Sequence, residues 1–177
     1  MLPCSHEHFS GLSAWALVVL PHGGHSQLLA AAGRLARRGP ITILDGGNRC
    51  NVYTLTRAVG GWPEALERIT LSRAFTCYQM AALLEDTPTG TAPIILLDLL
   101  STFYDETVQA FERRRLLNGC LAHLGRLSRG AGVVVSVGIP RSASPENGAL
   151  LAALRAGADG VWTPAPALPI AEPQKLF

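Results

Sequence analysis

The sequence predicts an α/β fold in which a mainly parallel sheet is flanked by helices, giving three layers. Short apolar runs alternate with longer segments of helical period, which is typical of strands joined by helical crossovers. All but one of these runs are almost purely apolar, as strands buried on both faces require. The 177 residues and 48% hydrophobic content allow one sizeable core. We therefore expect a single domain over residues 1–164 and an extended, proline-rich tail over 165–177.

The expected strands follow in chain order, at residues 16–20, 41–45, 70–75, 93–97, 132–137 and 160–163. The first helix, over 26–39, places Leu28, Ala32 and Leu35 on one face. Three arginines lie near its C-terminal end, where the helix dipole favours cations, and Gly39 with Pro40 ends it. Further helices are expected at 51–59, 63–69, 77–86 and 107–129, with Thr76 as the cap of the third and a basic "ERRR" surface on the last.

Charge, cysteine spacing and hydropathy exclude several classes of protein. The chain has 15 Lys and Arg against 13 Asp and Glu, so net charge gives no strong attraction to nucleic acid or acidic membranes. The four cysteines form no CxxC pair, which favours reduced, buried thiols over a zinc or redox motif. The apolar run "LSAWALVVL" is too short to span a bilayer. We expect a cytoplasmic or nucleoid-associated protein without a membrane partner.

The stretch "VLPHGGHS" has the layout of a degenerate phosphate-binding loop between a strand and a helix. In the GxxxxGK[ST] form, glycines free backbone amides, the lysine neutralises phosphates and the hydroxyl binds magnesium. Here Val19 replaces the first glycine and His25 replaces the lysine, while Gly24 and Ser26 are kept. A histidine is mostly neutral at pH 7 and gives no permanent charge. We interpret the stretch as a structural turn that no longer binds ATP, with weak or altered nucleotide binding as the alternative.

Three later stretches follow in order: "ITILDGGNRCNVYTLTRAVGGWPEALERITLSRAFTCYQMAALLE", "PIILLDLLSTFYDE" and "LLNGCLAHLGRLSRGAGVVVSVGIP". From about residue 18 to 139 the chain resembles the ATPase core of RecA and related strand-exchange recombinases, most specifically in "LERITLSRAFTCYQM". The resemblance implies a RecA-like, P-loop NTPase fold. It places Asp98 at the Walker B aspartate that holds magnesium, although an N-cap or turn aspartate is an equal alternative.

Other catalytic positions of that family are missing. Gly47 stands where a glutamate activates the attacking water, and Val137 with Gly138 stands where an Asn-Gln pair senses the γ-phosphate. The loop "RSASPENG" is short for a DNA-binding loop of the family. Hydrolysis needs the metal, the neutralised charge and the oriented water together, so we expect no catalytic residues. The degenerate nucleotide site would consist of Gly23, Gly24, His25, Ser26 and Asp98, with no cofactor expected and ATP with Mg²⁺ at most weakly bound.

The function that the resemblance implies is that of a pseudo-ATPase, a RecA-like accessory protein in DNA recombination or repair. Such chains are similar to recombinase paralogues and to RecA-like accessory and cell-division-inhibitor proteins of the bacterial damage response. The implied partners are an active recombinase or a second copy, with direct DNA contact left open. One alternative is an ATP-binding regulatory subunit without efficient hydrolysis. Another is a flavodoxin-like small-molecule enzyme, because "LRAGADGVWTP" is similar to the end of receiver domains.

Several polar and aromatic residues have simpler interpretations. Asp45, Asn48 and Arg49 in "DGGNR" follow a strand where open sheets bind ligands, but Asp45 and Asn48 also suit the backbone of a glycine turn, which we favour. The histidines are expected to be solvated or hydrogen-bonded rather than metal ligands, with His22 and His25 beside Asp45 or Asp98 as the only metal alternative. Consecutive arginines spread around a helix predict a solvated face, and the three tryptophans suit core or edge packing.

The chain ends in "EPQKLF". Gln174, Leu176 and Phe177 resemble the short peptides that dock into the bacterial sliding clamp, one residue short of the usual spacing. We expect partner binding there, against the alternative that the terminal apolar pair folds back on the sheet.

Overall fold

The computed structural model describes residues 15–20, 25–139 and 144–163, which form a six-stranded sheet in the order β3-β2-β4-β5-β1-β6. Every strand pairing in it is parallel. The strands are β1 (Trp15–Leu20), β2 (Ile41–Asp45), β3 (Ile69–Arg73), β4 (Ile94–Leu97), β5 (Val133–Gly138) and β6 (Gly160–Trp162). Each lies within two residues of its expected position, so the parallel α/β prediction is confirmed. The tail expected over 165–177 lies outside the described residues.

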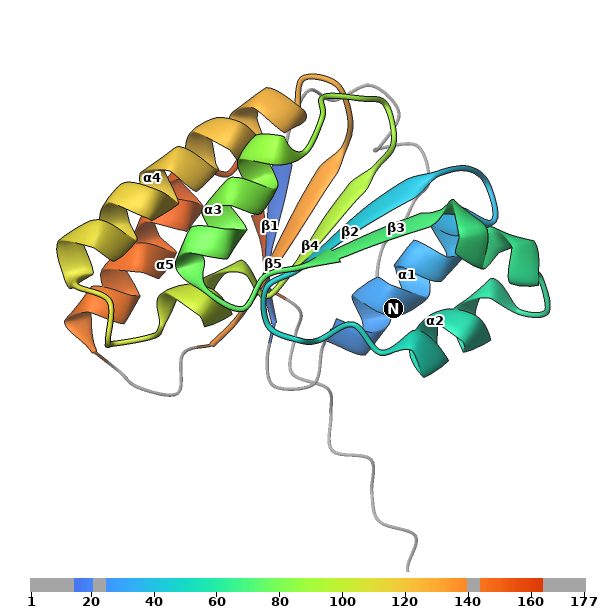
Figure 1. Cartoon of the computed structure of the whole chain (residues 1–177), viewed down its shortest axis with the longest axis horizontal. Coiled ribbons are helices and arrows are strands. Elements are labelled where there is room, and N and C mark those ends of the chain that lie inside the picture. The colour runs from blue at the N-terminus through green and yellow to red at the C-terminus, as the bar shows by residue number, and fades with distance from the viewer. Residues whose placement is uncertain (1–14, 21–24, 140–143, 164–177) are drawn as a thin grey trace, which may run out of the picture.

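Helices cover both faces of the sheet, which gives the three layers that the sequence predicts. Figure 1 shows α1 and α2 on one face and α3, α4 and α5 on the other. Their bounds are α1 (His25–Ala36), α2 (Val52–Val59), α3 (Cys77–Asp86), α4 (Ala110–Leu127) and α5 (Pro145–Gly157), with 3-10 turns η1 (Pro63–Arg68) and η2 (Leu99–Phe103). In the described part of the chain, no helix has the length and apolar character needed to cross a membrane.

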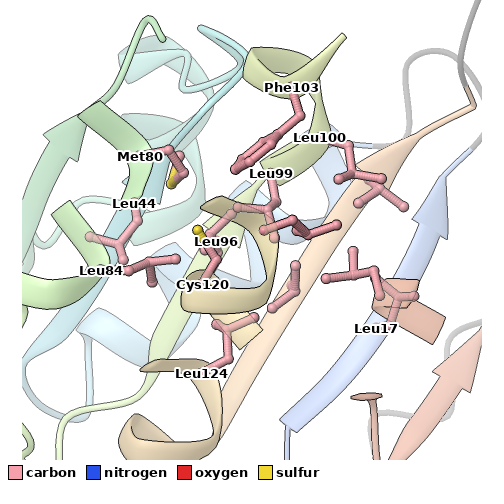
Figure 2. Packing of buried hydrophobic residues seen from close by; sticks show 14 of the residues in the cluster. Leu17, Leu44, Met80, Leu84, Leu96, Leu99, Leu100, Phe103, Cys120 and Leu124 are labelled. Carbon is pink, nitrogen blue, oxygen red and sulfur yellow. The ribbon is translucent and has the colours of Figure 1, made fainter. Parts of the chain in front are cut away.

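The core has two parts because the central strands bury side chains on both faces. The larger part lies beneath α3, α4 and α5, where Leu96 and Phe103 are fully buried among leucines, Met80 and Cys120 (Figure 2). The smaller part lies beneath α1 and α2 and contains Ile43, Ile95 and Leu97. α1 and α2 also pack closely, since a Cβ at Gly33 would overlap the Cβ of Ala58. This double burial is why the central strands read as apolar runs.

Two local expectations were wrong. Residues 145–148, expected in a loop, form the first turn of α5, because Ser144 Oγ accepts a hydrogen bond from Asn147 N at 3.1 Å and Pro145 suits a first helical position. Arg113, expected on a solvated face, is only 3% exposed. Its guanidinium donates to Phe103 O at 3.1 Å and to Glu146 Oε2 at 2.8 Å. Arg113, the first of the three consecutive arginines, therefore faces inward and joins α4 to α5.

Candidate functional site at the carboxyl edge of the sheet

Two of the predicted nucleotide-site residues, His25 and Asp98, meet at the carboxyl edge of the sheet. In a parallel sheet all strands end at one edge, and α1 begins there after β1. His25 is the first residue of α1, and Asp98 follows β4 directly. Ser26 is exposed on α1, while Gly23 and Gly24 lie outside the described residues. The structure thus places His25 beside Asp98, with Nε2 and Oδ2 3.7 Å apart, and leaves the glycine turn untested.

Both carboxylate oxygens of Asp98 accept hydrogen bonds from other residues of the chain. Arg49 Nε donates to Oδ2 at 2.8 Å, and Gly138 N donates to Oδ1 at 2.9 Å. The backbone adopts φ 52°, which is uncommon for a residue with a side chain, and Asp98 N donates to Ser136 Oγ at 3.0 Å. Asp98 sits at the N-cap position of η2 but makes no side-chain cap bond. Asp98 is thus an N-cap residue by position only, and its carboxylate joins the end of β4 to the turn after β2 and to β5, which agrees with the turn-aspartate alternative.

His25 is a buried imidazole held between Asp98 and β5. Its ring lies with Nδ1 3.3 Å from Ser136 Oγ, and the residue is 8% exposed. Burial lowers the pKa of His25; the nearby Asp98 carboxylate raises it in part, and the Arg49 guanidinium lowers it further. The expectation of a mostly neutral side chain at pH 7 is thus supported. The position that would carry a permanent positive charge in a phosphate loop carries none here.

Asp45 organises the turn after β2. Its Oδ1 accepts from Gly47 N at 3.3 Å and Arg49 N at 2.9 Å, while Oδ2 accepts from Cys50 N at 2.9 Å and Arg73 Nε at 3.1 Å. The carboxylate is fully buried. The prediction that Asp45 satisfies the backbone of a glycine turn is therefore confirmed. The same turn directs the Arg49 side chain toward Asp98, a contact that sequence reasoning missed.

The turn also closes the space beside Asp98. A Cβ at Gly47 would lie 2.7 Å from both Asp98 Cβ and Asp98 Oδ2. A Cβ at Gly46 would lie 2.7 Å from Met80 Cε and 3.0 Å from the Asp98 carbonyl oxygen. Such separations are far inside van der Waals contact, so a glutamate cannot stand at position 47 in this arrangement. The packing of the turn against Asp98 thus leaves no room for a side chain at position 47.

Asp98 and His25, as they are arranged, offer neither a free carboxylate nor a permanent positive charge to a magnesium nucleotide. The Asp98 carboxylate is bound on both oxygens, and a neutral imidazole stands in place of the lysine. Among the described residues, no group of three or more His, Cys, Asp and Glu side chains is placed to hold a metal ion. His22, which belonged to the metal alternative, lies outside them. The Asp98 carboxylate instead connects the end of β4 to Arg49 after β2 and to Gly138 at the end of β5.

The remaining residues singled out in the sequence are the cysteines, the tryptophans and the C-terminal residues. Cys50, Cys77 and Cys120 are buried free thiols, as expected, and burial raises the pKa of Cys120 to about 12. Trp15 packs in the core, whereas Trp62 is 53% exposed and lies outside it. Gln174, Leu176 and Phe177 lie outside the described residues, so clamp docking stays a prediction.

Comparison with known proteins shows the fold. The crystal structure of the RadB recombinase superimposes with a TM-score of 0.57 at 16% sequence identity, over 76% of this chain and 66% of that chain, just under two thirds of its length. No protein-family model and no curated protein sequence matches the chain. At this identity the likeness establishes the RecA-like fold alone. The flavodoxin-like topology is wrong, because β1 lies between β5 and β6 instead of beside β2 and β3.

Proposed function

We propose that this chain is a RecA-like pseudo-ATPase that acts as an accessory protein in DNA recombination or repair through contacts with other proteins. The internal binding of Asp98 carries the proposal. Arg49 and the Gly138 amide hold the carboxylate that would fix magnesium. Phosphoryl transfer depends on a fixed metal, neutralised phosphate charge and a positioned water. A neutral His25 and a glycine with no room for a side chain stand at the other two positions.

The biological setting of the proposal comes from the fold. The similar solved structure is named as a recombinase, and RecA-type subunits assemble by packing one core against the next. An active recombinase or a second copy of this chain is therefore the partner that we propose. Docking of Gln174, Leu176 and Phe177 into a sliding clamp is a separate, secondary contact.

One observation favours a second candidate, an ATP-binding regulatory subunit without efficient hydrolysis. The Arg49 side chain is 42% exposed although its partner Asp98 is 3% exposed. A guanidinium binds phosphate well in a bidentate geometry. If a nucleotide drew Arg49 toward its phosphates, Asp98 would be released to bind magnesium. This candidate predicts magnesium-dependent nucleotide binding that needs Arg49.

Titration with a fluorescent ATP analogue separates the two candidates. The wild type, Arg49→Met and the double variant Ser26→Ala with Asp98→Ala are titrated to millimolar nucleotide, with and without Mg²⁺, and phosphate release is followed in parallel. No binding by the wild type supports the pseudo-ATPase. Binding that Arg49→Met abolishes, without turnover, supports the regulatory subunit. Binding with turnover that the double variant abolishes contradicts both.

The accessory role has its own test. Strand exchange by a RecA-like recombinase is measured with and without an equimolar amount of this chain, and complex formation is followed by analytical ultracentrifugation. We expect a complex and an altered rate of exchange. An unchanged rate together with separate sedimentation of the two proteins contradicts the accessory role, even if the nucleotide titration supports loss of ATPase activity.

A further inference from the structure

The edge of the sheet opposite Asp98 carries a surface hollow. α1 ends at Ala36 and β2 begins at Ile41, so the C-terminal end of α1 lies at the amino edge. There a surface hollow of about 350 Å³ is lined by Arg34, Arg37, Arg38 and Trp62. We name these four residues the arginine–tryptophan hollow. All three arginines are exposed, and no acidic residue lines the hollow.

The tryptophan is held in place by its own segment of chain. Gly60 and Gly61 adopt left-handed conformations, with φ 60° and 80°, that turn the chain from α2 toward Trp62. Trp62 O then accepts from Ala65 N at 3.0 Å as η1 begins. The Arg37 guanidinium lies 5.4 Å from the ring centroid of Trp62, in a cation–π contact. The indole is thus exposed to solvent beside the positive charge of Arg37.

Two of the arginines of the hollow, Arg34 and Arg37, offer positive charge to a ligand. In the described part of the chain, Arg34 and Arg37 form no ion pair with an acidic side chain, unlike Arg49 and Arg73 at the other edge. The helix dipole places partial negative charge at the C-terminal end of α1. Arg68 offsets part of it, because Arg68 Nη1 donates to the Arg37 carbonyl oxygen at 3.3 Å. An anion that enters the hollow therefore meets an excess of guanidinium groups.

We propose that the arginine–tryptophan hollow binds single-stranded nucleic acid. Guanidinium groups bind phosphate oxygens, and bases stack on exposed aromatic rings and on guanidinium planes, so both components of a nucleotide chain find a partner here. An acidic peptide would use the arginines but has no need of an exposed indole. The inference goes beyond the proposed function, because it concerns the opposite edge of the sheet and needs neither ATP nor a protein partner.

Fluorescence anisotropy with labelled oligo(dT) and oligo(U) tests the proposal on the full chain without nucleotide. Arg34→Gln with Arg37→Gln should weaken binding at least about tenfold and reduce the salt slope by about 1.4, at ~0.7 per lost phosphate contact. Trp62→Ala should weaken it about fivefold or more, while Trp62→Phe should retain it, because stacking needs an aromatic face. The matched control, Arg114→Gln with Arg155→Gln, removes equal charge from exposed arginines of α4 and α5 and should leave binding within about threefold.

Binding of either oligonucleotide with these variant effects supports the proposal, and the tighter one identifies the natural class of strand. Equal weakening by the control pair overturns it, since the binding would then follow net charge. An unchanged affinity in Trp62→Ala, or equal binding of a duplex of the same length, also overturns it. Tighter binding of a labelled poly-glutamate peptide that is lost in the Arg34 and Arg37 variant would assign the hollow to an acidic protein instead. Circular dichroism confirms that each variant is folded.

Discussion

Removing Arg49 tests whether the chain itself holds the Asp98 carboxylate. Arg49 Nε lies 2.8 Å from Asp98 Oδ2, and the two side chains are 42% and 3% exposed. Breaking a fully buried ion pair costs about 3–5 kcal/mol, and a hydrogen bond to a charged group contributes about 1.5–3 kcal/mol. Solvent around Arg49 favours the lower part of this range. We expect Arg49→Met to lower the free energy of unfolding by about 2 kcal/mol, or ~4–8 °C in a chain of this size.

A double-mutant cycle with Asp98→Asn isolates the pair. Once the carboxylate is replaced by a neutral amide, no buried charge remains for Arg49 to stabilise, so adding Arg49→Met should cost less than about 0.5 kcal/mol. The coupling energy is then about 1.5 kcal/mol, measured by urea unfolding. Arg115→Met is the control, because Arg115 forms an exposed pair with Glu112 at 2.7 Å. Such surface pairs contribute about 0–1 kcal/mol.

Two results would refute the reasoning. If Arg49→Met costs no more than Arg115→Met, Arg49 is not held by Asp98 in solution. If the coupling energy is below about 0.5 kcal/mol, the carboxylate does not depend on the guanidinium. In either case the position of the magnesium ligand would be accessible, and the proposal of a pseudo-ATPase would lose the observation that carries it.

Three further predictions follow from the same contacts. Burial lowers the pKa of His25 in the folded chain. In the unfolded chain the imidazole keeps its ordinary pKa near 6.5 and is protonated below that pH, whereas the folded chain disfavours the protonated form. Stability should thus fall as pH drops from 7.5 to 5.5, by at most about 1.4 kcal/mol per unit, and His25→Gln should flatten the urea midpoints across that range. Gly47→Ala should destabilise the protein by more than about 2 kcal/mol, because its Cβ would overlap Asp98. Gly119→Ala on α4 has open space at its Cβ and should stabilise the protein by roughly 0.5–1 kcal/mol. Thermal melts that rank the two variants the other way contradict the packing at Asp98. Arg126→Met loses bonds to Leu84 O, Thr87 O and Thr89 Oγ1, each 2.9 Å, and should speed limited proteolysis within residues 87–92, an effect that Arg114→Met must not reproduce.

The fold could be predicted because strands that are buried on both faces of a sheet consist of short apolar runs. The central strands are apolar at nearly every buried position, with Asp45 and Ser136 as buried polar exceptions, and the strand ends fall within two residues of the expected ones. The run richest in polar residues, β3, lies at the edge of the sheet, where its side chains are largely half-buried or exposed. The start of α5 was missed because Ser144 and Pro145 are as common in loops as at helix beginnings, and only the bond to Asn147 N decides between them.

The sequence predicted which residues lie at the candidate site, but not which of them contact one another. His25 and Asp98 were found from the phosphate-loop layout and the strand that ends in aspartate. The partner of Asp98 is 49 residues away, and the contact exists because β2 and β4 are neighbours in the sheet. No local pattern encodes that adjacency. The burial of Arg113 was missed for a similar reason, since which of three consecutive arginines faces inward depends on the position of α5.

The two edges of the sheet differ in how their arginines are used, and this difference relates the two proposals. At the carboxyl edge, Arg49 and Arg73 are each bound to an aspartate that is almost fully buried. A ligand there must break an internal pair before it gains its own contact, so its affinity is reduced by the energy of that pair. At the amino edge, Arg34 and Arg37 form no ion pair with an acidic residue of the described chain, and an anion gains their attraction without that loss. This difference is why we propose that a phosphate chain binds at the arginine–tryptophan hollow and that no nucleotide binds at Asp98.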